Sequence, residues 1–363
     1  MTRVTTSKEW RVAVVRCDTH AYWFGVFMDE PDMQVLSTHD NEEAPTRVAV
    51  HHHFKAGPAE PGRLKIQRVP GFRITKVFDR IPEAGLEADG RPKLQYGTYP
   101  ARARAFSETF LSHPKVCESM EELVEDVDAG YIADSSSPKD GADHLELARP
   151  FLERGIPCFV DKPFAATLAD AKEMVRLAKA NNTVLMNASI LAHTDVGKRF
   201  RNRFEEIGDV GMIVVKGCGP SNSGVGHGLA LAHGMVGYGV EWVECIGSIP
   251  LECILLHYAN GLEAFVLSAP DTVFARTHSF CCSAFSRLGV IHSPGMSDPE
   301  FDTGTRRIVE LFKQMLDTRT PPIPYEHILE PIAIIEAARI AQKQGRRVAL
   351  KEVLETNGAP GRE

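Results

Sequence analysis

Five consecutive residues, Arg16 to His20, combine side chains that bind anions, ligate metals or move protons. They follow directly the apolar run Val12–Val15, and the stretch reads RCDTHAYWFG. An apolar strand that turns into a helix is where the motif G-x-G-x-x-G binds the pyrophosphate of a dinucleotide. In this chain the three glycine positions of that motif hold Arg16, Asp18 and Ala21.

The three replacements have different consequences for a bound phosphate. The glycines of the motif permit a tight turn and a close approach of the backbone to the pyrophosphate. Arg16 offers a guanidinium to a phosphate instead, whereas Asp18 adds bulk and a charge of the repelling sign. Ala21 is an accepted substitute. We therefore predict that a nicotinamide nucleotide binds in a rebuilt pyrophosphate loop.

An acidic residue follows the second predicted strand. Asp79 ends that strand, where a carboxylate hydrogen-bonds the ribose of NAD. Arg80 comes next and would accept the 2′-phosphate of NADP. The pair predicts NAD as the preferred cofactor, with NADP possible.

Length and composition limit the class of protein. A chain of 363 residues fits two domains, and 43% apolar with 25% charged residues indicates a globular protein. A formal charge of -7 gives no electrostatic footprint for nucleic acid. No run of 18 apolar residues spans a membrane, and the start MTRVTTSKEW lacks the apolar core of a signal peptide. We expect a cytoplasmic protein without nucleic-acid or membrane partners.

The eight cysteines do not form a recognisable framework. They are scattered without a C-x-x-C pair, which argues against a disulfide scaffold and a zinc ribbon. Cys281 and Cys282 lie in a predicted strand, where one of two adjacent side chains faces a core. We predict packing, and not chemistry, for this pair.

The first half of the chain alternates short apolar runs with amphipathic stretches. This alternation predicts βαβ units and a parallel sheet. Helices are expected at Met120–Val127, at His144–Arg154 before Gly155, and from a capping box at Thr167 and Asp170. The predicted strands are Arg11–Val15, Arg73–Phe78, Ala129–Ala133, Pro157–Val160 and Val184–Met186.

One segment is too long for a simple connection. Residues 26–72 separate the first strand and helix from the second strand, so we interpret them as an insertion that carries function or covers a site. They include His51, His52 and His53. Adjacent residues of an extended chain point to opposite faces, so the three do not easily ligate one ion. We assign no metal site.

After about residue 190 the pattern becomes rich in strands. Two helices close the chain, at Thr303–Leu316 and Ile328–Gln344. Runs of strands with segregated helices predict an α+β domain on an open, largely antiparallel or mixed sheet. We therefore predict a Rossmann-like parallel domain over residues 1–190 and a substrate-binding and oligomerisation α/β domain over 191–363. The predicted strands of the second domain are Met212–Lys216, Leu251–His257, Leu262–Ala269, His278–Ser286 and Val290–His292.

The segment AGYIADSSSPKDGADHLELARPFLERGIPCFVDKPFAATLADAKEMVRLAKANN carries a family resemblance. It resembles the glucose-fructose oxidoreductase, inositol dehydrogenase and rhizopine-catabolism (Gfo/Idh/MocA) family. There a helix begins near a histidine and is followed by a glycine, a strand and the motif E-K-P. The counterparts here are His144, Gly155 and Asp161-Lys162-Pro163, with aspartate in place of glutamate. The run PPIPYEHILEPIAIIEAARIAQKQGRRVAL is similar to the family's closing helix and strand.

The resemblance implies an NAD- or NADP-binding Rossmann domain and an open second sheet through which homodimers or homotetramers form. It implies a sugar, sugar acid or cyclitol as substrate. The lysine of E-K-P holds and polarises the reacting hydroxyl, so Lys162 takes this role. An ammonium in a cleft stabilises a developing alkoxide. The alternative is a surface lysine paired with Asp161.

The family's acid/base motif D-x-x-x-H is altered in this chain. The corresponding stretch LALAHGMVGYGVEWVECIG puts His233 near the aspartate position and Gly237 near the histidine position, and a shift of four residues makes His233 the acid/base itself. Histidine suits proton transfer near neutral pH. His227 is the next candidate, and a satisfied buried histidine is the alternative for either.

The candidate site is thus divided between two roles. Lys162, His233 and His227 are the predicted catalytic residues. The predicted cofactor-binding residues are Arg16, Cys17, Asp18, Thr19, His20, Asp79, Arg80, Ser135, Ser136, His144 and Asp161.

Three functions compete for this sequence. The first is an NAD-dependent oxidoreductase of a sugar-like or cyclitol-like alcohol or its keto form. The second is a non-redox relative, a lyase, isomerase or hydrolase, that has lost the phosphate loop. It would bind an acid or metal-chelating substrate through Asp18, His20 and His144, with the inserted histidines as further candidates. The third is a catalytically silent binding or scaffold protein. The RCDTH stretch is the feature that discriminates the first two functions, because a carboxylate and an imidazole replace flexible glycine there.

Overall fold

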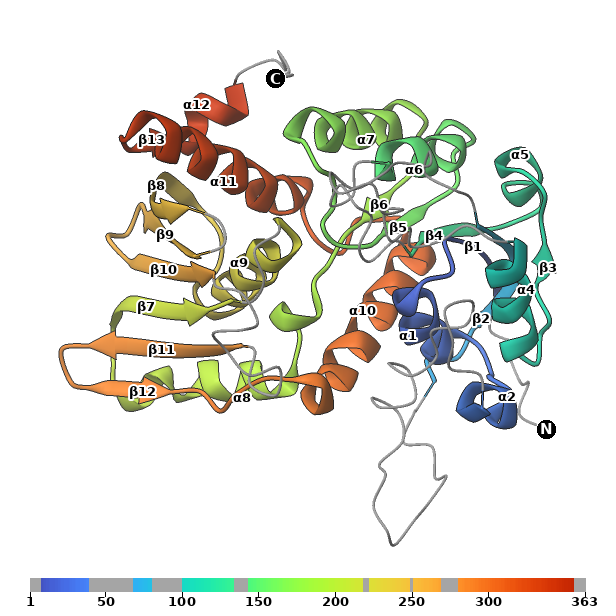
Figure 1. The fold of residues 1–363 in the computed structure, drawn as a ribbon, viewed down its shortest axis with the longest axis horizontal. Coiled ribbons are helices and arrows are strands. Elements are labelled where there is room, and N and C mark those ends of the chain that lie inside the picture. Colours follow the sequence, from blue (N-terminus) through green and yellow to red (C-terminus); the bar gives the residue numbers. More distant parts are fainter. Residues whose placement is uncertain are drawn as a thin grey trace, which may run out of the picture.

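The computed structural model describes residues 8–38, 68–79, 100–133, 143–217, 222–248, 251–268 and 280–355. Two sheets lie side by side along the long axis of the molecule, each with helices packed on it (Figure 1). Six residues that the sequence singled out fall outside these ranges: His51, His52, His53, Arg80, Ser135 and Ser136.

The first sheet has six strands in the order β3-β2-β1-β4-β5-β6, and all its pairs are parallel. This is the strand order of a dinucleotide-binding domain, so the predicted Rossmann-like sheet is confirmed. All five predicted strands form, and β3 adds a pair of residues too short to show a pattern. The strands are β1 (Trp10–Val15), β2 (Phe72–Phe78), β3 (Lys115–Val116), β4 (Ala129–Ile132), β5 (Cys158–Val160) and β6 (Leu185–Met186).

The helices of this domain begin where the caps predict. Thr167 accepts the N–H of Asp170 at the start of α7, and Gly155 has a φ of 71° after α6. The helix expected from Met120 is short because Asp126 already has a φ of 51°. The helices are α1 (Thr19–Met28), α2 (Met33–Thr38), α4 (Pro100–Thr109), α5 (Met120–Leu123), α6 (His144–Glu153) and α7 (Leu168–Ala180).

The expected insertion over 26–72 is wrong at both of its ends. Residues 26–28 belong to α1, residues 33–38 form α2, and Phe72 is the first residue of β2. Helix α1 lacks an amphipathic pattern because it is buried almost all round, with Trp23 stacked on Phe301 at 6.1 Å. An apolar helix without a polar face gives no periodic signal in the sequence.

The second sheet has seven strands in the order β12-β11-β7-β10-β9-β8-β13. All its pairs are antiparallel except β10 with β7, which confirms the predicted open, mixed sheet. Strand β8 was missed because its apolar residues are interrupted by two glutamates and a glycine. The strands are β7 (Val210–Lys216), β8 (Val240–Ser248), β9 (Leu251–Tyr258), β10 (Glu263–Ser268), β11 (Cys281–Ser286), β12 (Val290–His292) and β13 (Val348–Ala349).

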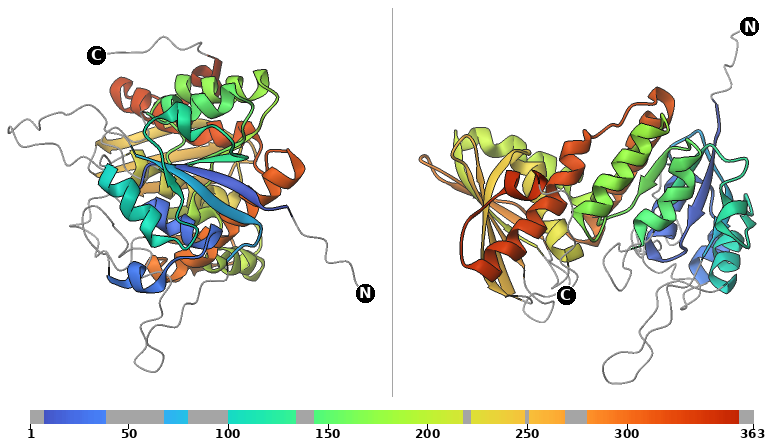
Figure 2. Two further views of the ribbon diagram at one scale, coloured as in Figure 1. Left: turned by 90° about the vertical axis from the view of Figure 1, so that its right-hand side faces the viewer. Right: turned by 90° about the horizontal axis from the view of Figure 1, so that it is seen from above.

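The described helices of this half cover only the face of the second sheet that looks toward the first domain (Figure 2). Cys282 points into the core while Cys281 is half-buried, so the two cysteines pack as predicted. The helical elements are η1 (Ile190–Ala192), α8 (Asp195–Asn202), η2 (Arg203–Glu206), α9 (Asn222–Val236), α10 (Asp298–Thr318), α11 (Tyr325–Gln344) and α12 (Leu350–Glu355).

Helix α10 returns from the second half of the chain to the first sheet. Its Phe312 stacks on Phe72 at 5.5 Å and lies 5.7 Å from Phe159. The indole N–H of Trp10 donates to Asp317 at 2.8 Å. The proposed domain division at residue 190 stays a prediction. Helix α10 follows that position in the sequence but packs on the first sheet.

The turn after β1 keeps a glycine-like backbone without a glycine. Arg16 has a φ of 73°, and its N–H donates to the carbonyl of Phe78 at 3.0 Å. This left-handed conformation is one that a side chain with a Cβ adopts at a cost. The first position of the altered motif thus retains the conformation, although the residue type has changed.

The variants Arg16→Gly and Arg16→Ala distinguish the energetic effect of the backbone conformation from that of the side chain. Both variants lose the guanidinium, but only alanine must hold a φ of 73° with a Cβ. We expect Arg16→Ala to be less stable than Arg16→Gly by about 1 kcal/mol in urea unfolding. Equal stabilities would show that the turn does not retain this conformation.

Candidate active site

The candidate site lies where the parallel strands of the first sheet end. Strand β1 ends at Val15 before the turn of Arg16 to Asp18, and β5 ends at Val160 before the loop Asp161–Pro163. Ligands of open α/β sheets bind outside the carboxyl ends of the strands, beside the point where the strand order reverses. The topology therefore brings the two predicted motifs to one edge.

The buried charge of Arg16, in the turn after β1, is paired within the protein. The side chain of Arg16 is 1% exposed, and its guanidinium pairs with the carboxylate of Asp143 at the amino end of α6. Arg16 was predicted to contact a phosphate, and in this structure it contacts Asp143. Its role toward a nucleotide stays a prediction.

Asp18 caps helix α1. It is 2% exposed, and its carboxylate accepts the N–H of His20 at 3.0 Å. The amino end of a helix is a ready site for an anion because its N–H groups lack partners and its dipole is positive. Asp18 therefore places the protein's own carboxylate where a phosphate of a dinucleotide would bind.

Asp79 and Cys17 meet on the other side of this turn. The carboxylate of Asp79 accepts the N–H of Cys17 at 3.3 Å. Burial raises the pKa of Asp79 to about 7, although Arg16 and Arg102 act in the opposite direction. Burial also raises the pKa of the Cys17 thiol well above its usual value, so Cys17 contributes its backbone N–H and not a thiolate. Thr19 is the first residue of α1 and is partly exposed.

The loop Asp161–Pro163 is held from several sides. The amide of Asn187 donates to the carbonyls of Val160 and Asp161, both at 3.0 Å. One carboxylate oxygen of Asp161 accepts the N–H of Lys162 at 2.8 Å, and the other contacts Nδ1 of His20. The Lys162–Pro163 peptide bond is cis. The loop thus presents Lys162 from a fixed backbone.

His144 supports this loop from behind. It is fully buried, and its Nδ1 lies 3.2 Å from the carbonyl of Phe164. This contact ties the start of α6 to the residue that follows Pro163. The structure therefore shows a positioning contact for His144, and its predicted contact with a cofactor stays a prediction.

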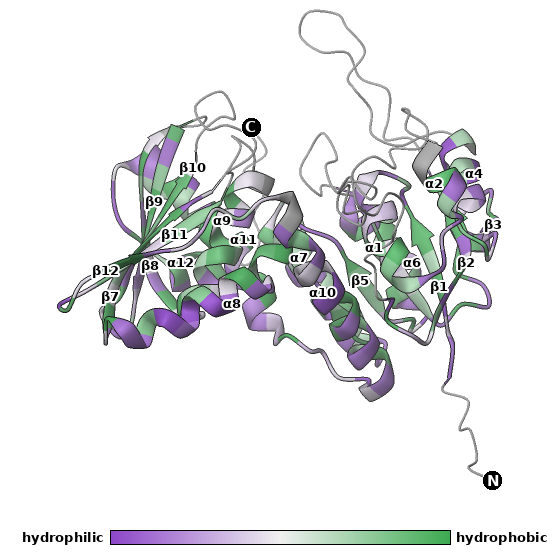
Figure 3. Cartoon of the chain, turned by 90° about the horizontal axis from the view of Figure 1, so that it is seen from below, coloured by the Kyte–Doolittle hydropathy of each residue, from purple (hydrophilic) through white to green (hydrophobic). Residues whose placement is uncertain are grey.

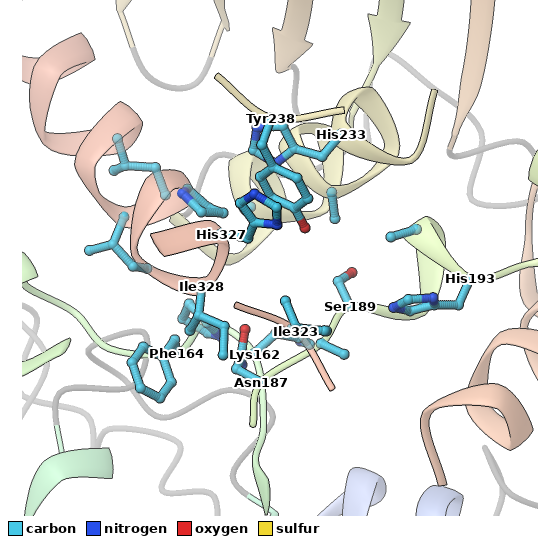
Figure 4. Close-up of a pocket in the computed structure, with 18 residues that line it drawn as sticks. Lys162, Phe164, Asn187, Ser189, His193, His233, Tyr238, Ile323, His327 and Ile328 are labelled. Atoms are coloured by element: carbon cyan, nitrogen blue, oxygen red, sulfur yellow. The ribbon is translucent and has the colours of Figure 1, made fainter. Parts of the chain in front are cut away.

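A small pocket of about 60 Å³ joins the loop to the second domain (Figure 4). Lys162 and Asn187 lie on one side of it, and His233, Tyr238 and His327 lie on the other. The lining residues are Lys162, Pro163, Phe164, Asn187, Ala188, Ser189, Ala192, His193, Gly226, Ala230, His233, Tyr238, Ile323, His327, Ile328, Pro331, Ile332 and Ile335.

His227 belongs to the same region. Its Nδ1 lies 3.2 Å from Oγ of Ser189. Burial lowers the pKa of His227 well below its usual value, and the nearby charges of Lys162 and His20 lower it further. His227 is therefore a neutral imidazole at neutral pH and a weaker base than an exposed histidine.

His233, the other predicted acid/base, sits in a stack of rings. It packs on Tyr238 at 4.3 Å, and Tyr238 packs on His327 at 4.0 Å. Its Nε2 lies 3.3 Å from Glu330, whose carboxylate also accepts the N–H of Gly239 at 3.0 Å. The side chain of His233 is 1% exposed. The structure places His227 near Lys162, while His233 links α9 to α11 at the pocket wall; the catalytic roles of both stay predictions.

Several pocket residues were not singled out from the sequence. Tyr238, His327 and Glu330 come together only through the contact of α9 with α11, which no local pattern reveals. His193 has a pKa lowered to about 4 by burial and by Lys198 and Arg307. Asn187 and Ser189 follow β6, and their position after a predicted strand is a signal that could have pointed to them.

A nicotinamide nucleotide at this edge would have to replace a contact that the protein already makes. Arg16 and Asp79 lie beside the turn after β1, and Lys162 lines the pocket, as the predicted cofactor site requires. At the amino end of α1, a phosphate would share or replace the contact that Asp18 makes with His20. Within the described ranges, no group of three or more His, Cys, Asp or Glu residues is arranged to hold a metal ion. Among those same residues, no helix is long and apolar enough to cross a membrane.

Fold and site together define a two-domain protein with a nucleotide-binding Rossmann domain. Residues 92–189 match the model of the Gfo/Idh/MocA family, described as an oxidoreductase family with an NAD-binding Rossmann fold. The match covers the first of the two segments that carry the family resemblance, so the resemblance to the Gfo/Idh/MocA family is confirmed.

Relatives of known activity match part of the chain. It is 27% identical over 150 residues to scyllo-inositol 2-dehydrogenase (NADP(+)) IolU of Bacillus subtilis (strain 168), which is 41% of this chain and 39% of that protein. It is 29% identical over 167 residues to 1,5-anhydro-D-fructose reductase of Ensifer adhaerens, which is 46% of each. The match thus spans less than half the length of either relative.

The fold also matches solved structures. The myo-inositol dehydrogenase from Lactobacillus casei in complex with NAD(H) and myo-inositol has a TM-score of 0.65 and 14% identity, over 97% of this chain and 99% of that one. At this identity the likeness concerns the fold, and it extends over both domains.

Asp18→Asn tests whether the cap competes with a phosphate. Asparagine keeps the capping oxygen but removes the negative charge. One like charge at about 4 Å is worth about 1 kcal/mol even in water, so we expect NAD to bind about fivefold more tightly or better by calorimetric titration. Asp18→Gly should act in the same direction.

The same variants separate two functions of the site. Tighter binding of NAD with activity retained agrees with a nucleotide-binding turn. Loss of activity without any gain in nucleotide affinity would instead make Asp18 a ligand or base of a non-redox site.

Proposed function

We propose that the protein is an NAD(P)-dependent oxidoreductase that acts on a hydroxyl or keto group of a sugar, sugar acid or cyclitol. The observation that carries the proposal is Lys162, which enters a pocket at the carboxyl edge of the Rossmann sheet from the fixed loop Asp161–Pro163. The substrate class is supported by relatives named for scyllo-inositol and 1,5-anhydro-D-fructose. Substrates of this kind carry many hydroxyls, which suit a pocket that contains amide, hydroxyl and imidazole groups.

We assign two roles to residues of this region: one group stabilises the charge on the reacting oxygen, and another takes its proton. A bound nicotinamide would accept or supply the hydride. The ammonium of Lys162 would hydrogen-bond the reacting oxygen and stabilise the negative charge that develops on it. His227, neutral and beside Lys162, is placed to take the hydroxyl proton, and His233 is the second candidate for this role.

NAD is the cofactor that we favour over NADP. Asp79 stands at the end of β2, where a carboxylate hydrogen-bonds a ribose hydroxyl and repels a 2′-phosphate. One relative is named for NADP(+), so NADP stays the alternative. Titration with both nucleotides distinguishes them.

A second candidate function rests on the turn after β1. Asp18 caps α1 and Arg16 pairs with Asp143, so both charged residues already have partners in the protein. A non-redox relative, a lyase, isomerase or hydrolase, would use the same pocket without a dinucleotide. Failure of NAD and NADP to bind at millimolar concentration would favour it.

Lys162→Ala tests the proposed role of the ammonium. We expect turnover of a polyol, followed by NADH absorbance, to fall by about 10² to 10³-fold, because a donor that stabilises developing charge is lost. Affinity for the nucleotide and the thermal midpoint should change little. Unchanged turnover would remove Lys162 from the mechanism.

We also propose that the second sheet joins two or more copies of the chain. Its outer face is not covered by any described helix (Figure 3). Apolar side chains alternate onto this face from adjacent strands, and they are only partly buried. Because Val214, Leu255 and Phe265 share one register, they form a continuous apolar surface, as an interface core requires.

Phe265→Glu should convert the oligomer to a monomer. The substitution puts a charge at the centre of the apolar face, where burial against a second copy would cost several kcal/mol. Light scattering after size exclusion measures the mass. Gln314→Glu, on an exposed position of α10, is the control and should leave the mass unchanged. An unchanged mass of the Phe265 variant would contradict this interface.

A further inference from the structure

Two side chains of the altered motifs meet at the edge of the first sheet. Nδ1 of His20, in the first turn of α1, contacts one carboxylate oxygen of Asp161. The other oxygen of Asp161 accepts the N–H of Lys162 at 2.8 Å. Asp161 is fully buried. Its carboxylate is thus fixed by two contacts and orients the imidazole of His20.

The ring of His20 is held in place on its other sides. It meets Trp23 edge to face at 5.4 Å, and Phe24 lies 5.9 Å away. The hydroxyl of Tyr131 donates to the carbonyl of His20 at 3.2 Å. A ring fixed in this way keeps one nitrogen on Asp161 and directs the other away from it.

The second nitrogen of His20 is free to meet a ligand. Among the described residues, no hydrogen bond involves Nε2 of His20, and 10% of the side chain is exposed. Lys162 follows Asp161 directly and lines the pocket. The charges of Lys162 and His20 both add to the effect of burial in lowering the pKa of His227.

We infer that His20 and Asp161 form a proton-transfer dyad beside Lys162, in which Asp161 fixes Nδ1 and Nε2 of His20 exchanges a proton with a substrate hydroxyl. The inference rests on the proposed oxidoreductase function for its chemistry. It assigns the hydroxyl proton to His20 in place of His227 and His233, the two candidates from α9.

The dyad accounts for the proton in both directions of the reaction. In oxidation, the O–H bond would break and its proton would bind Nε2, while the carbon that bears this oxygen would lose a hydride, for which a bound nicotinamide would be the acceptor, and become a carbonyl carbon. In reduction, Nε2 returns the proton to the oxygen. A carboxylate on Nδ1 stabilises the imidazolium that forms and keeps the neutral ring in the tautomer with Nε2 unprotonated.

The charged and titratable groups around His20 come from its own helix, from the loop after β5 and from α9. On its own helix, Asp18 accepts the N–H of His20. From the loop after β5 come Asp161 and Lys162, and from α9 comes His227. Two carboxylates and one ammonium therefore surround the imidazole, and only Asp161 touches the ring.

A matched pair of variants separates proton transfer from a structural link. His20→Asn places its amide where Nδ1 was, so the contact with Asp161 can persist, but it lacks Nε2. Asp161→Asn keeps the imidazole and removes the carboxylate. His292→Gln, on the remote edge strand β12, is the control.

Two readouts test the dyad without turnover. In ¹⁵N spectra of the whole protein, we expect His20 of the wild type to carry its proton on Nδ1, and Asp161→Asn to lose this preference. Carbethoxylation of His20 by diethyl pyrocarbonate, mapped by mass spectrometry, should be fast at Nε2 and slower in Asp161→Asn. A wild-type ring protonated on Nε2, or equal carbethoxylation rates, would overturn the dyad.

Turnover gives the third readout. With NAD and a polyol that the wild type oxidises, kcat of His20→Asn should fall by about 10²-fold or more, and the acid limb of its pH profile should disappear. A wild-type profile in His20→Asn would overturn the dyad while leaving the oxidoreductase intact. If no polyol is oxidised, the proposed function fails, and the spectra and the carbethoxylation still decide the dyad.

Discussion

Charge buried at the carboxyl edge of the first sheet is the constraint on which the site depends. Ionised side chains removed from water need partners, because an unpaired buried charge costs several kcal/mol. Arg16 pairs with Asp143, Asp18 caps α1, and Asp161 contacts both His20 and the N–H of Lys162. The contacts of Arg16 with Asp143 and of His20 with Asp161 join segments that are more than 120 positions apart in the sequence. The edge of the sheet is therefore held by charges where a glycine-rich turn would leave it open for a ligand.

This constraint explains how the turn after β1 can lose its glycines and keep its backbone. Arg16 adopts the φ of 73° that the first glycine would supply. Its buried guanidinium pairs with Asp143, so the cost of the backbone is offset within the same residue. Asp18 satisfies an N–H at the amino end of α1 that a phosphate would otherwise satisfy. A nucleotide that binds here must replace interactions that the protein already makes.

The sequence predicted the first domain better than the site. Buried parallel strands are apolar runs, and the capping residues of α7 are local, so both are visible in a linear pattern. Helix α1 was read too short because burial on all sides removes its periodicity. The contact of His20 with Asp161 spans 141 positions, and the stack of His233, Tyr238 and His327 joins two helices. Such contacts depend on the packing of distant elements, for which a single sequence contains no signal.

The size of the pocket sets a requirement for any ligand. About 60 Å³ is far below the 300 to 1,000 Å³ of typical ligand sites. This volume is only part of what a sugar ring beside a nicotinamide would occupy. Lys162 is fixed through Asp161 and Asn187 on one side. On the other side, His327 contributes one face of a ring stack at the start of α11. Because Lys162 is held by its neighbours on one wall of the pocket, we expect substrate selectivity to depend on the facing wall, which includes Tyr238 and His327.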